Sequence, residues 1–129
     1  MVNDARDVPQ FIRCADTARA PNRCEGGTNL VAMECMACGV PAILSGNTGH
    51  RDLLAVPGAA LRLERQAPIS GEMFADWGES DPDEIVAHLE WAFAHRAEAA
   101  KIGAAGAAVM ADWGWPTKID ALFAALGWG

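Results

Sequence analysis

The sequence predicts an α/β fold in which about three parallel strands are flanked by helices in three layers. Short apolar runs, of the length typical of buried strands, alternate along the chain with longer segments that have helical periodicity. The chain has 129 residues, of which 51% are hydrophobic and 21% are charged. This length and composition indicate a single globular domain that spans 1–129.

In the first half of the chain, apolar runs and helix-capping residues define the expected elements. They are a short helix at 8–13 with Pro9 in its first turn, a strand within 15–20, a loop at 21–28, a helix from 28 to about 38, and a buried strand at 42–45. Thr28 is the expected N-cap of the second helix. Gly39 stands where a left-handed residue commonly ends a helix, and Pro41 prevents its continuation.

The second half of the chain predicts one more strand and two longer helices. The expected elements are a turn at 46–49, a short helix at 50–54, a strand at 59–63, irregular polar chain at 65–80, a helix from 83 to about 110, and a last helix at 117–126. The run Asp81-Pro82-Asp83-Glu84 is typical of a helix start with a capping box. Gly103 and Gly106 indicate either a helix break or a close helix contact. We expect Trp113 and Trp115 to pack the last helix against the body.

The acidic balance of the chain argues against two classes of function. The formal net charge is −7 and the pI is near 4.8. General nucleic-acid binding and electrostatic docking on an anionic membrane both need clustered Lys and Arg. The N-terminus has no signal-peptide pattern, and no run of about 18 apolar residues is present, so we expect a cytoplasmic protein without a transmembrane segment.

Cysteine and histidine spacing gives no complete metal site. Cys35 and Cys38 have the C-x-x-C spacing that allows a redox or zinc hypothesis, but no second Cys or Cys/His pair accompanies them. We interpret them as packing residues on a helix and expect no metal. His50 is expected to be solvated at a helix start, with a position in a cleft as the alternative. His88 and His95 are expected at the surface.

The loop at 21–28 and the helix that follows it form a candidate anion site. The first amides of a helix have no partner within the helix, and the helix dipole makes that end positive. Gly26 and Gly27 allow a ligand to approach the backbone closely. Glu25 and Glu34 flank the helix start, and carboxylates accept hydrogen bonds from hydroxyl groups. The pattern therefore suits a sugar nucleotide, with a capped helix and a solvated Glu25 as the alternative.

Three runs of residues within 21–41 carry a resemblance to a known family. They are Pro21-Asn22-Arg23, Glu25-Gly26-Gly27 and Ala32-Met33-Glu34-Cys35-Met36-Ala37-Cys38-Gly39-Val40-Pro41. They resemble the donor-site signature of retaining glycosyltransferases with the GT-B fold, of the group 1 or family 4-like type. Later segments fit the same order, namely 41–45 with Gly49, 103–105 and 113–115. The resemblance implies a partial Rossmann-like domain, the second half of a GT-B C-terminal donor domain.

The resemblance also implies a role for each matched residue. Glu25 takes the catalytic position that contacts hydroxyls of the transferred sugar, and Glu34 takes the position that binds the nucleotide ribose. The diphosphate is expected at the helix N-terminus and its loop, against Gly26, Gly27, Thr28 and Asn29, with Gly49 lining the same cleft. The donor is a nucleotide sugar, and neither a cofactor nor a metal is implied. Catalysis in such a site is mainly positioning and stabilisation of the departing diphosphate.

Three departures from the family pattern qualify the expected activity. Eight residues separate Glu25 from Glu34, one more than is usual, and a shift within the helix would turn Glu34 by about 100°. Arg19 falls in an expected buried strand, which indicates a sheet edge or relaxed selection on a remnant. The family's basic pair and its acceptor domain lie upstream of the matched segment. We therefore expect a donor domain that is incomplete for catalysis alone. The alternative is a non-catalytic module that forms a homodimer or pairs with a chain supplying the N-terminal half.

Overall fold

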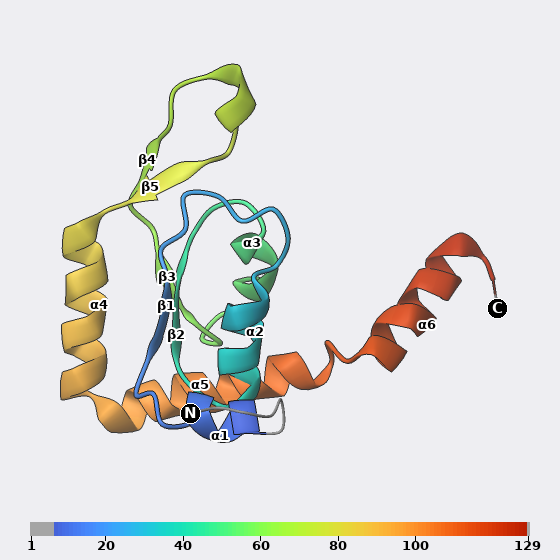
Figure 1. Cartoon of the computed structure of the whole chain (residues 1–129), viewed down its shortest axis with the longest axis horizontal. Helices are drawn as coiled ribbons and strands as arrows, with labels where there is room; N and C mark the ends of the chain where they lie inside the picture. The colour runs from blue at the N-terminus through green and yellow to red at the C-terminus, as the bar shows by residue number, and fades with distance from the viewer. Residues whose placement is uncertain (1–6, 129) are drawn as a thin grey trace.

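The computed structural model describes residues 7–128 and contains a central parallel sheet. Its strands are β1 (Ala18–Ala20), β2 (Ala42–Ser45) and β3 (Leu61–Leu63), in the order β1-β2-β3 (Figure 1). All four residues of β2 are buried, as expected for a central strand covered on both faces. The predicted α/β class with three parallel strands flanked by helices is confirmed.

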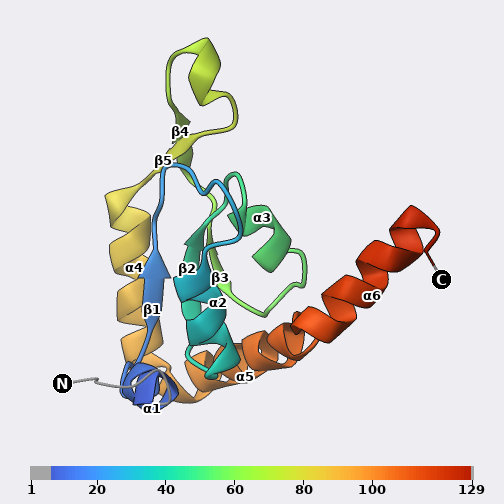
Figure 2. The same cartoon turned by 45° about the vertical axis from the view of Figure 1, so that its right-hand side comes forward.

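Helices lie on both sides of this sheet. Helix α2 (Leu30–Ala37) packs on β1 and β2, and α1 (Val8–Ile12) lies beside α2. Helix α4 (Pro82–Ala94) packs against β3 on the opposite side, while α3 (His50–Leu53) lies on the α2 side (Figures 1 and 2). This arrangement gives the helix–sheet–helix layers that the alternating pattern predicts.

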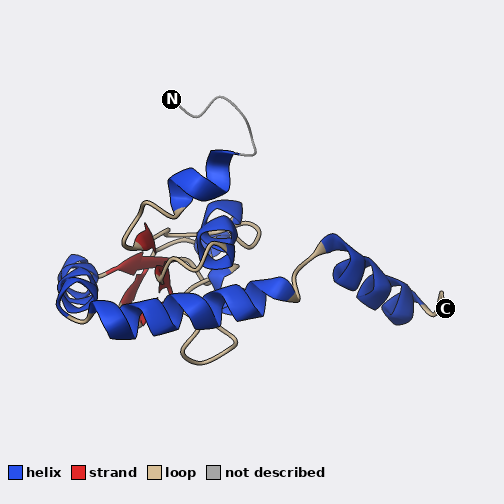
Figure 3. Cartoon of the chain, turned by 90° about the horizontal axis from the view of Figure 1, so that it is seen from below, coloured by secondary structure: helices blue, strands red, loops and turns tan. Residues whose placement is uncertain are grey.

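Helix α5 (Arg96–Ala111) runs along the amino ends of the three strands (Figure 3). A Cβ atom on Gly103 would lie 2.1 Å from the Gly39 carbonyl oxygen, and one on Gly106 would lie 2.9 Å from the Ala59 carbonyl oxygen. Arg96 forms an ion pair with Asp16, just before β1. The two glycines therefore mark a close helix contact, which is the second of the two interpretations that the sequence left open.

The N-cap of α2 is Asn29, so the prediction of Thr28 was one residue early. The Asn29 Oδ1 atom accepts a hydrogen bond from the Ala32 N–H at 3.1 Å. The Thr28 hydroxyl instead donates to the Met33 sulfur at 3.2 Å. The end of α2 is as predicted, because Gly39 has a φ of 78° and ends the helix in the left-handed region.

The prediction of one helix from 83 to about 110 was wrong. The helix breaks at His95, whose φ of −121° and ψ of 53° are not helical, and α5 begins there at a new angle. Asp81 caps α4 by accepting from the Asp83 N–H at 2.8 Å. The expected reciprocal bond from Glu84 does not form, because its carboxylate accepts from the N–H groups of Glu64 and Arg65. Glu84 thereby fastens α4 to the end of β3.

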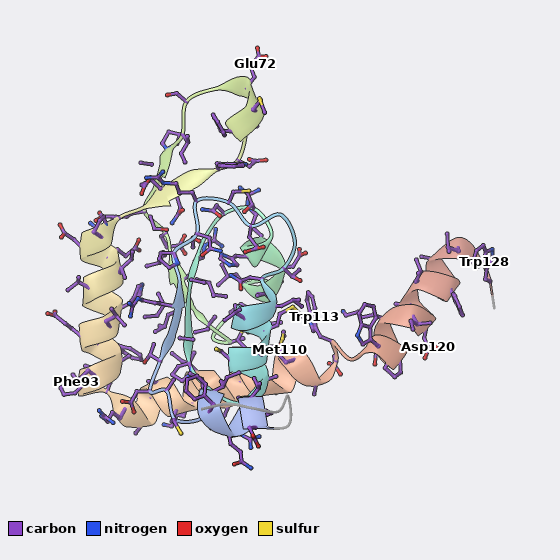
Figure 4. All side chains as sticks on the ribbon, in the orientation of Figure 1. Glu72, Phe93, Met110, Trp113, Asp120 and Trp128 are labelled. Carbon is purple, nitrogen blue, oxygen red and sulfur yellow. The ribbon has the colours of Figure 1, made fainter. Side chains whose placement is uncertain are left out.

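Residues 65–80, predicted to be irregular, contain an antiparallel hairpin. Strands β4 (Gln66–Pro68) and β5 (Gly78–Ser80) pair, and a short 3₁₀ helix (Glu72–Phe74) forms the tip. Figure 4 shows Glu72 at the far end of this projection. Phe74 and Trp77 stabilise the tip by an edge-to-face contact with ring centroids 5.0 Å apart. The strands are only three residues long and contain Pro and Gly, so no periodic pattern reveals them.

Helix α6 (Trp115–Leu126) extends away from the body and has no buried residue (Figures 1–3). Trp115 is 81% exposed, so the expectation that it packs the last helix against the body was wrong. Trp113 is half-buried against the core, and the Lys118 ammonium lies 4.2 Å from its ring centroid. No helix within residues 7–128 is both long enough and apolar enough to span a membrane.

The apolar core lies between α2, β2 and α5. Its buried members are alanine, leucine and methionine residues: Ala32, Met36, Ala42, Leu44, Leu53, Ala59 and Met110. Arg19 is exposed on β1, an edge strand that pairs only with β2 in the described sheet, which agrees with the sheet-edge interpretation of that arginine.

The close approach of α5 predicts that Gly103→Ala destabilises the fold. The new methyl group would overlap the Gly39 carbonyl, so the free energy of unfolding should fall by about 1–3 kcal/mol. Gly114→Ala is the matched control, because its methyl group would meet only Pro116 at 3.8 Å. Urea unfolding followed by circular dichroism measures both variants. Equal stability of Gly103→Ala and Gly114→Ala would contradict the packing described above.

Candidate functional site

The carboxyl ends of the three parallel strands meet at one edge of the sheet, where three connections lie together. They are the loop 21–29 after β1, the turn 46–49 after β2, and the chain that leads from β3 into the β4–β5 hairpin. Open α/β sheets bind ligands at this edge. The candidate residues 25–29 lie in the first connection, Gly49 lies in the second, and Glu34 lies on the helix that follows the first. The end of the motif at 39–41 and the later segment 103–105 lie at the opposite edge, where Gly103 packs on Gly39.

Backbone contacts fasten the loop 21–29 to the turn 46–49. The Glu25 N–H donates to the Thr48 hydroxyl at 2.7 Å, and the Gly49 N–H donates to the Glu25 carbonyl at 3.2 Å. A Cβ atom on Gly49 would lie 1.4 Å from the Gly27 carbonyl oxygen, so only glycine fits there. Gly49 therefore holds the loop in place, and its amide is already occupied by Glu25.

The loop presents a row of backbone amides beside the start of α2. Within residues 7–128, the N–H groups of Gly26, Gly27 and Thr28 have no protein acceptor. Gly26 and Gly27 are exposed, and no atom lies within 4 Å of a Cβ built on either one. These amides and the positive end of α2 form a surface that suits an anion.

The two glutamates of the motif lie in different surroundings. Glu25 is half-buried in the loop, and its Oε2 atom accepts from the Asn22 side-chain amide at 2.9 Å. Glu34 is exposed on α2, about 6 Å along the helix axis from Leu30. It shares the outer face of α2 with Leu30 and Val31, which are 72% and 68% exposed. The structure thus brings Glu25 together with the loop amides and leaves Glu34 further along the helix.

Asn47 joins all three connections and was not predicted from the sequence. Its side chain is nearly inaccessible, and its Nδ2 atom lies within hydrogen-bond distance of three acceptors. These are the Asn22 carbonyl at 3.0 Å, the Gln66 Oε1 atom at 2.8 Å and the Gly78 carbonyl at 3.1 Å. Its Oδ1 atom accepts from Thr48 at 3.0 Å. A polar residue directly after a buried strand is the sequence signal that could have identified it.

His50 is fully buried, so the expectation of a solvated histidine was wrong. Its ring lies between the Ser45 hydroxyl, 3.0 Å from Nδ1, and the Asn29 side-chain amide, 3.0 Å from Nε2. Burial lowers the pKa of His50 below its ordinary value, while the Glu25 carboxylate and a backbone hydrogen bond at Ser45 act in the opposite direction. Two polar partners make this burial possible, and neither is adjacent to His50 in sequence.

The arginines around the site are engaged with carboxylates. Arg23, in the loop, pairs with Glu79 of β5, and Arg51, in α3, pairs with Asp76 at 3.5 Å. These side chains are all at least half exposed, so each pair contributes little to stability. An anion bound to the loop would therefore depend mainly on backbone amides.

The remaining candidates from the sequence do not join this site. The cysteines are free, and Cys35 is buried in α2, which agrees with a packing role. Burial, with smaller effects of Cys38 and Glu34, raises the pKa of the Cys35 thiol. Among the described residues, no group of three His, Cys, Asp or Glu side chains could hold a metal ion. His95 is exposed and stacks on Trp91, with ring centroids 5.3 Å apart.

Three cavities in the described part of the chain lie outside the loop. One, of about 580 Å³, lies between the chain before β1, the turn from α2 into β2, and the corner between α4 and α5, where Figure 4 places Phe93. It is at the amino ends of the strands, opposite the loop amides. A second, of about 400 Å³, lies between the turn after β2 and the hairpin tip. A third, of about 430 Å³, lies beside β4, β5 and Pro82. None of the three is lined by Glu25 or the loop glycines, so the candidate site is an open surface rather than an enclosed pocket.

The contact between Gly49 and Gly27 predicts that Gly49→Ala separates the two loops. The methyl group would overlap the Gly27 carbonyl, and we expect a loss of roughly 1–3 kcal/mol in the free energy of unfolding. Gly26→Ala is the control, since the space around Gly26 is open. Thermal unfolding and amide exchange of residues 25–29 report the effect. The contact would have no structural role if the two variants behaved alike.

Comparison of the chain with protein-family models, with curated proteins and with solved structures found no match. The site is therefore defined by its own geometry, at the carboxyl edge of a parallel α/β sheet.

Proposed function

We propose that this chain is a donor domain for a nucleotide sugar, related to the second half of the C-terminal domain of retaining GT-B glycosyltransferases. The observation that carries the proposal is the row of unpaired loop amides at Gly26, Gly27 and Thr28 beside the Glu25 carboxylate. Amides suit a diphosphate, and a fixed carboxylate suits the hydroxyls of a sugar. Both lie at the edge of the sheet where α/β domains bind ligands.

Each part of the donor has a matching part of the site. The loop amides and the N-terminus of α2, capped by Asn29, hold the diphosphate. Asn22 orients the Glu25 carboxylate, which accepts hydrogen bonds from the transferred sugar. Glu34 binds the ribose hydroxyls, and the exposed apolar side chains of Leu30 and Val31 lie on the same face of α2 for the ribose and base. No cofactor or metal takes part in this proposal.

The chain by itself positions the donor and offers amide groups to the diphosphate, but it places little positive charge beside it. Arg23 and Arg51 flank the site and are already paired with carboxylates. The departing diphosphate gains most when cations and donors are pre-arranged around it. We propose that glycosyl transfer takes place when a second surface supplies those cations and the acceptor.

The proposal predicts saturable binding of nucleotide sugars at the loop. In a ¹⁵N-labelled chain titrated with UDP- and GDP-hexoses, the amide signals of Gly26, Gly27 and Thr28 should shift. Glu34→Ala should weaken the affinity about tenfold or more, because it removes hydrogen bonds to a charged group. Glu90→Ala on α4, another exposed glutamate, is the matched control. Free uridine should leave the three loop amides unshifted, because it carries no phosphate.

The proposal fails if no nucleotide sugar shifts these three amides at millimolar concentration. It also fails if Glu34→Ala and Glu90→Ala bind with equal affinity.

A second candidate function, a non-catalytic interaction module, is favoured by α6. Its large apolar residues recur at helical spacing along one side of a helix that nothing in the described chain covers: Trp115, Ile119, Leu122, Phe123 and Leu126. Figure 4 shows Trp128 and Asp120 on this projecting segment. Such a stripe suits a second apolar surface, either on another copy or on a partner chain.

The interaction module predicts self-association through α6. Light scattering should give a mass above the 13.6 kDa of one chain. Leu122→Glu combined with Leu126→Glu should return it to the single-chain mass, because both charges fall on the apolar stripe. Ala124→Glu, on the opposite side of α6, should leave the mass unchanged. A single-chain mass at all concentrations would exclude self-association and leave only a different partner.

A further inference from the structure

A buried chain of polar groups lies behind the loop, and the proposed donor chemistry does not use it. Ser45 and His50 are completely inaccessible to solvent, and the ring of His50 links the end of β2 to the N-cap of α2. The other two histidines, His88 and His95, are not buried. A buried imidazole between two polar partners has a defined proton arrangement, and that arrangement can be worked out from its neighbours.

The direction of each hydrogen bond follows from the N-cap. The Asn29 Oδ1 atom accepts from the Ala32 N–H, so the amide nitrogen of Asn29 faces His50. That nitrogen only donates, so His50 Nε2 must accept and carries no proton. The ring proton is therefore on Nδ1, which donates to the Ser45 hydroxyl. The Ser45 hydroxyl in turn donates to the carbonyl oxygens of Asn22 and Ala20, at 2.8 and 3.2 Å.

This chain fixes both ends of the loop that carries Glu25 and the amides. Asn22 lies at the start of the loop and Asn29 at its end, and His50 reaches both, directly or through Ser45. Asn29 has a φ of 61°, so its backbone is held in the left-handed region. The side-chain contacts at Asn29 are what keep it oriented toward Ala32 and His50.

A second proton on the ring would break this arrangement. With both ring nitrogens protonated, an N–H at Nε2 would face the NH₂ group of Asn29, and two donors cannot form a hydrogen bond.

Glu25, on the loop, is the charged group that faces the ring. Strand β2 and helix α2 present the neutral Ser45 and Asn29. On α3 itself, Arg51 and Asp52 are exposed, and Arg51 pairs with Asp76.

The sign of the pH effect follows from burial. Burial lowers the pKa of His50 in the folded chain below the ordinary value of 6.5, so the folded state favours the neutral ring. A group of this kind contributes stability that is complete above the unfolded pKa and is lost as the pH falls through 6.5 toward the lower folded pKa. The loop is the part of the fold that depends directly on the neutral ring.

We propose that neutral His50 is the positioning residue of the loop 21–29, and that its protonation releases the Asn29 cap and opens that loop. The inference rests on the proposed function only in treating this loop as the ligand-binding element. The conformational step involves the uptake of one proton at His50 Nε2 and the loss of one hydrogen bond from Asn29.

Amide exchange of the full chain, measured without any nucleotide, tests the proposal. Between about pH 7.5 and about pH 5, exchange of the amides at 25–32, corrected for its intrinsic pH dependence, should become faster. Between pH 6.5 and the lower folded pKa, the protection should fall by up to about tenfold per pH unit, because opening is coupled to the uptake of one proton, and below the folded pKa it should level off. In His50→Gln, which cannot titrate, the corrected exchange should not depend on pH. His95→Gln, the same change at the exposed histidine, should keep the wild-type dependence.

Asn29→Asp provides a second test in case His50→Gln does not fold. The new carboxylate can cap α2 and also accept from a protonated ring, so loop protection should be retained or increased as the pH falls. The proposal is overturned if wild-type loop exchange is independent of pH. It is equally overturned if Asn29→Asp or His50→Gln keeps the wild-type dependence. Failure of nucleotide-sugar binding at about pH 7.5 would count against the proposed function and leave the exchange result standing.

Discussion

The parallel register of three short strands is the constraint on which the rest of the molecule depends. Because β2 pairs with β1 on one side and β3 on the other, the three carboxyl ends coincide at one edge and the three amino ends at the other. The connections after the strands therefore meet, although they are separated in sequence. Helix α5 covers the opposite edge. It lies close against the chain because Gly103 and Gly106 have no side chain at the points of contact. The carboxyl edge thus carries the candidate site, and the amino edge carries the packing against α5.

The carboxyl edge of the sheet is held together by polar rather than apolar contacts. Asn47, Ser45 and His50 are all buried, and burying polar groups is costly unless each finds a partner. In the part of the chain that the structure describes, no buried side-chain nitrogen or oxygen lacks a hydrogen-bond partner. The loop glycines can consequently remain exposed and short of side-chain contacts while their backbone stays fixed. A network of this kind specifies one geometry, because any displaced member leaves another unsatisfied.

Patterns local in sequence predicted most of the fold. The buried run at 42–45, the helix ending at Gly39 and the glycine loop before α2 depend on neighbouring residues, and they were predicted close to their observed positions. Features set by distant contacts were missed. The helix break at His95 depends on how α5 meets the strand ends, and the hairpin depends on pairing of two strands too short for a pattern. The burial of His50 requires Ser45 and Asn29, which only the fold brings to it. The donor role of the site remains a prediction.

The place of α5 has a consequence for how the chain folds during synthesis. Met110, near the end of α5 (Figure 4), belongs to the same buried cluster as Ala32 and Leu44, and Gly103 packs on Gly39. The core therefore joins segments from the first third of the chain to one near its end. Domains generally fold as units once their last required segment has left the ribosome. The sheet and its loops must wait, with the apolar faces of β2 and α2 uncovered, until α5 emerges. During that interval the uncovered apolar faces are available for aggregation and for binding by chaperones.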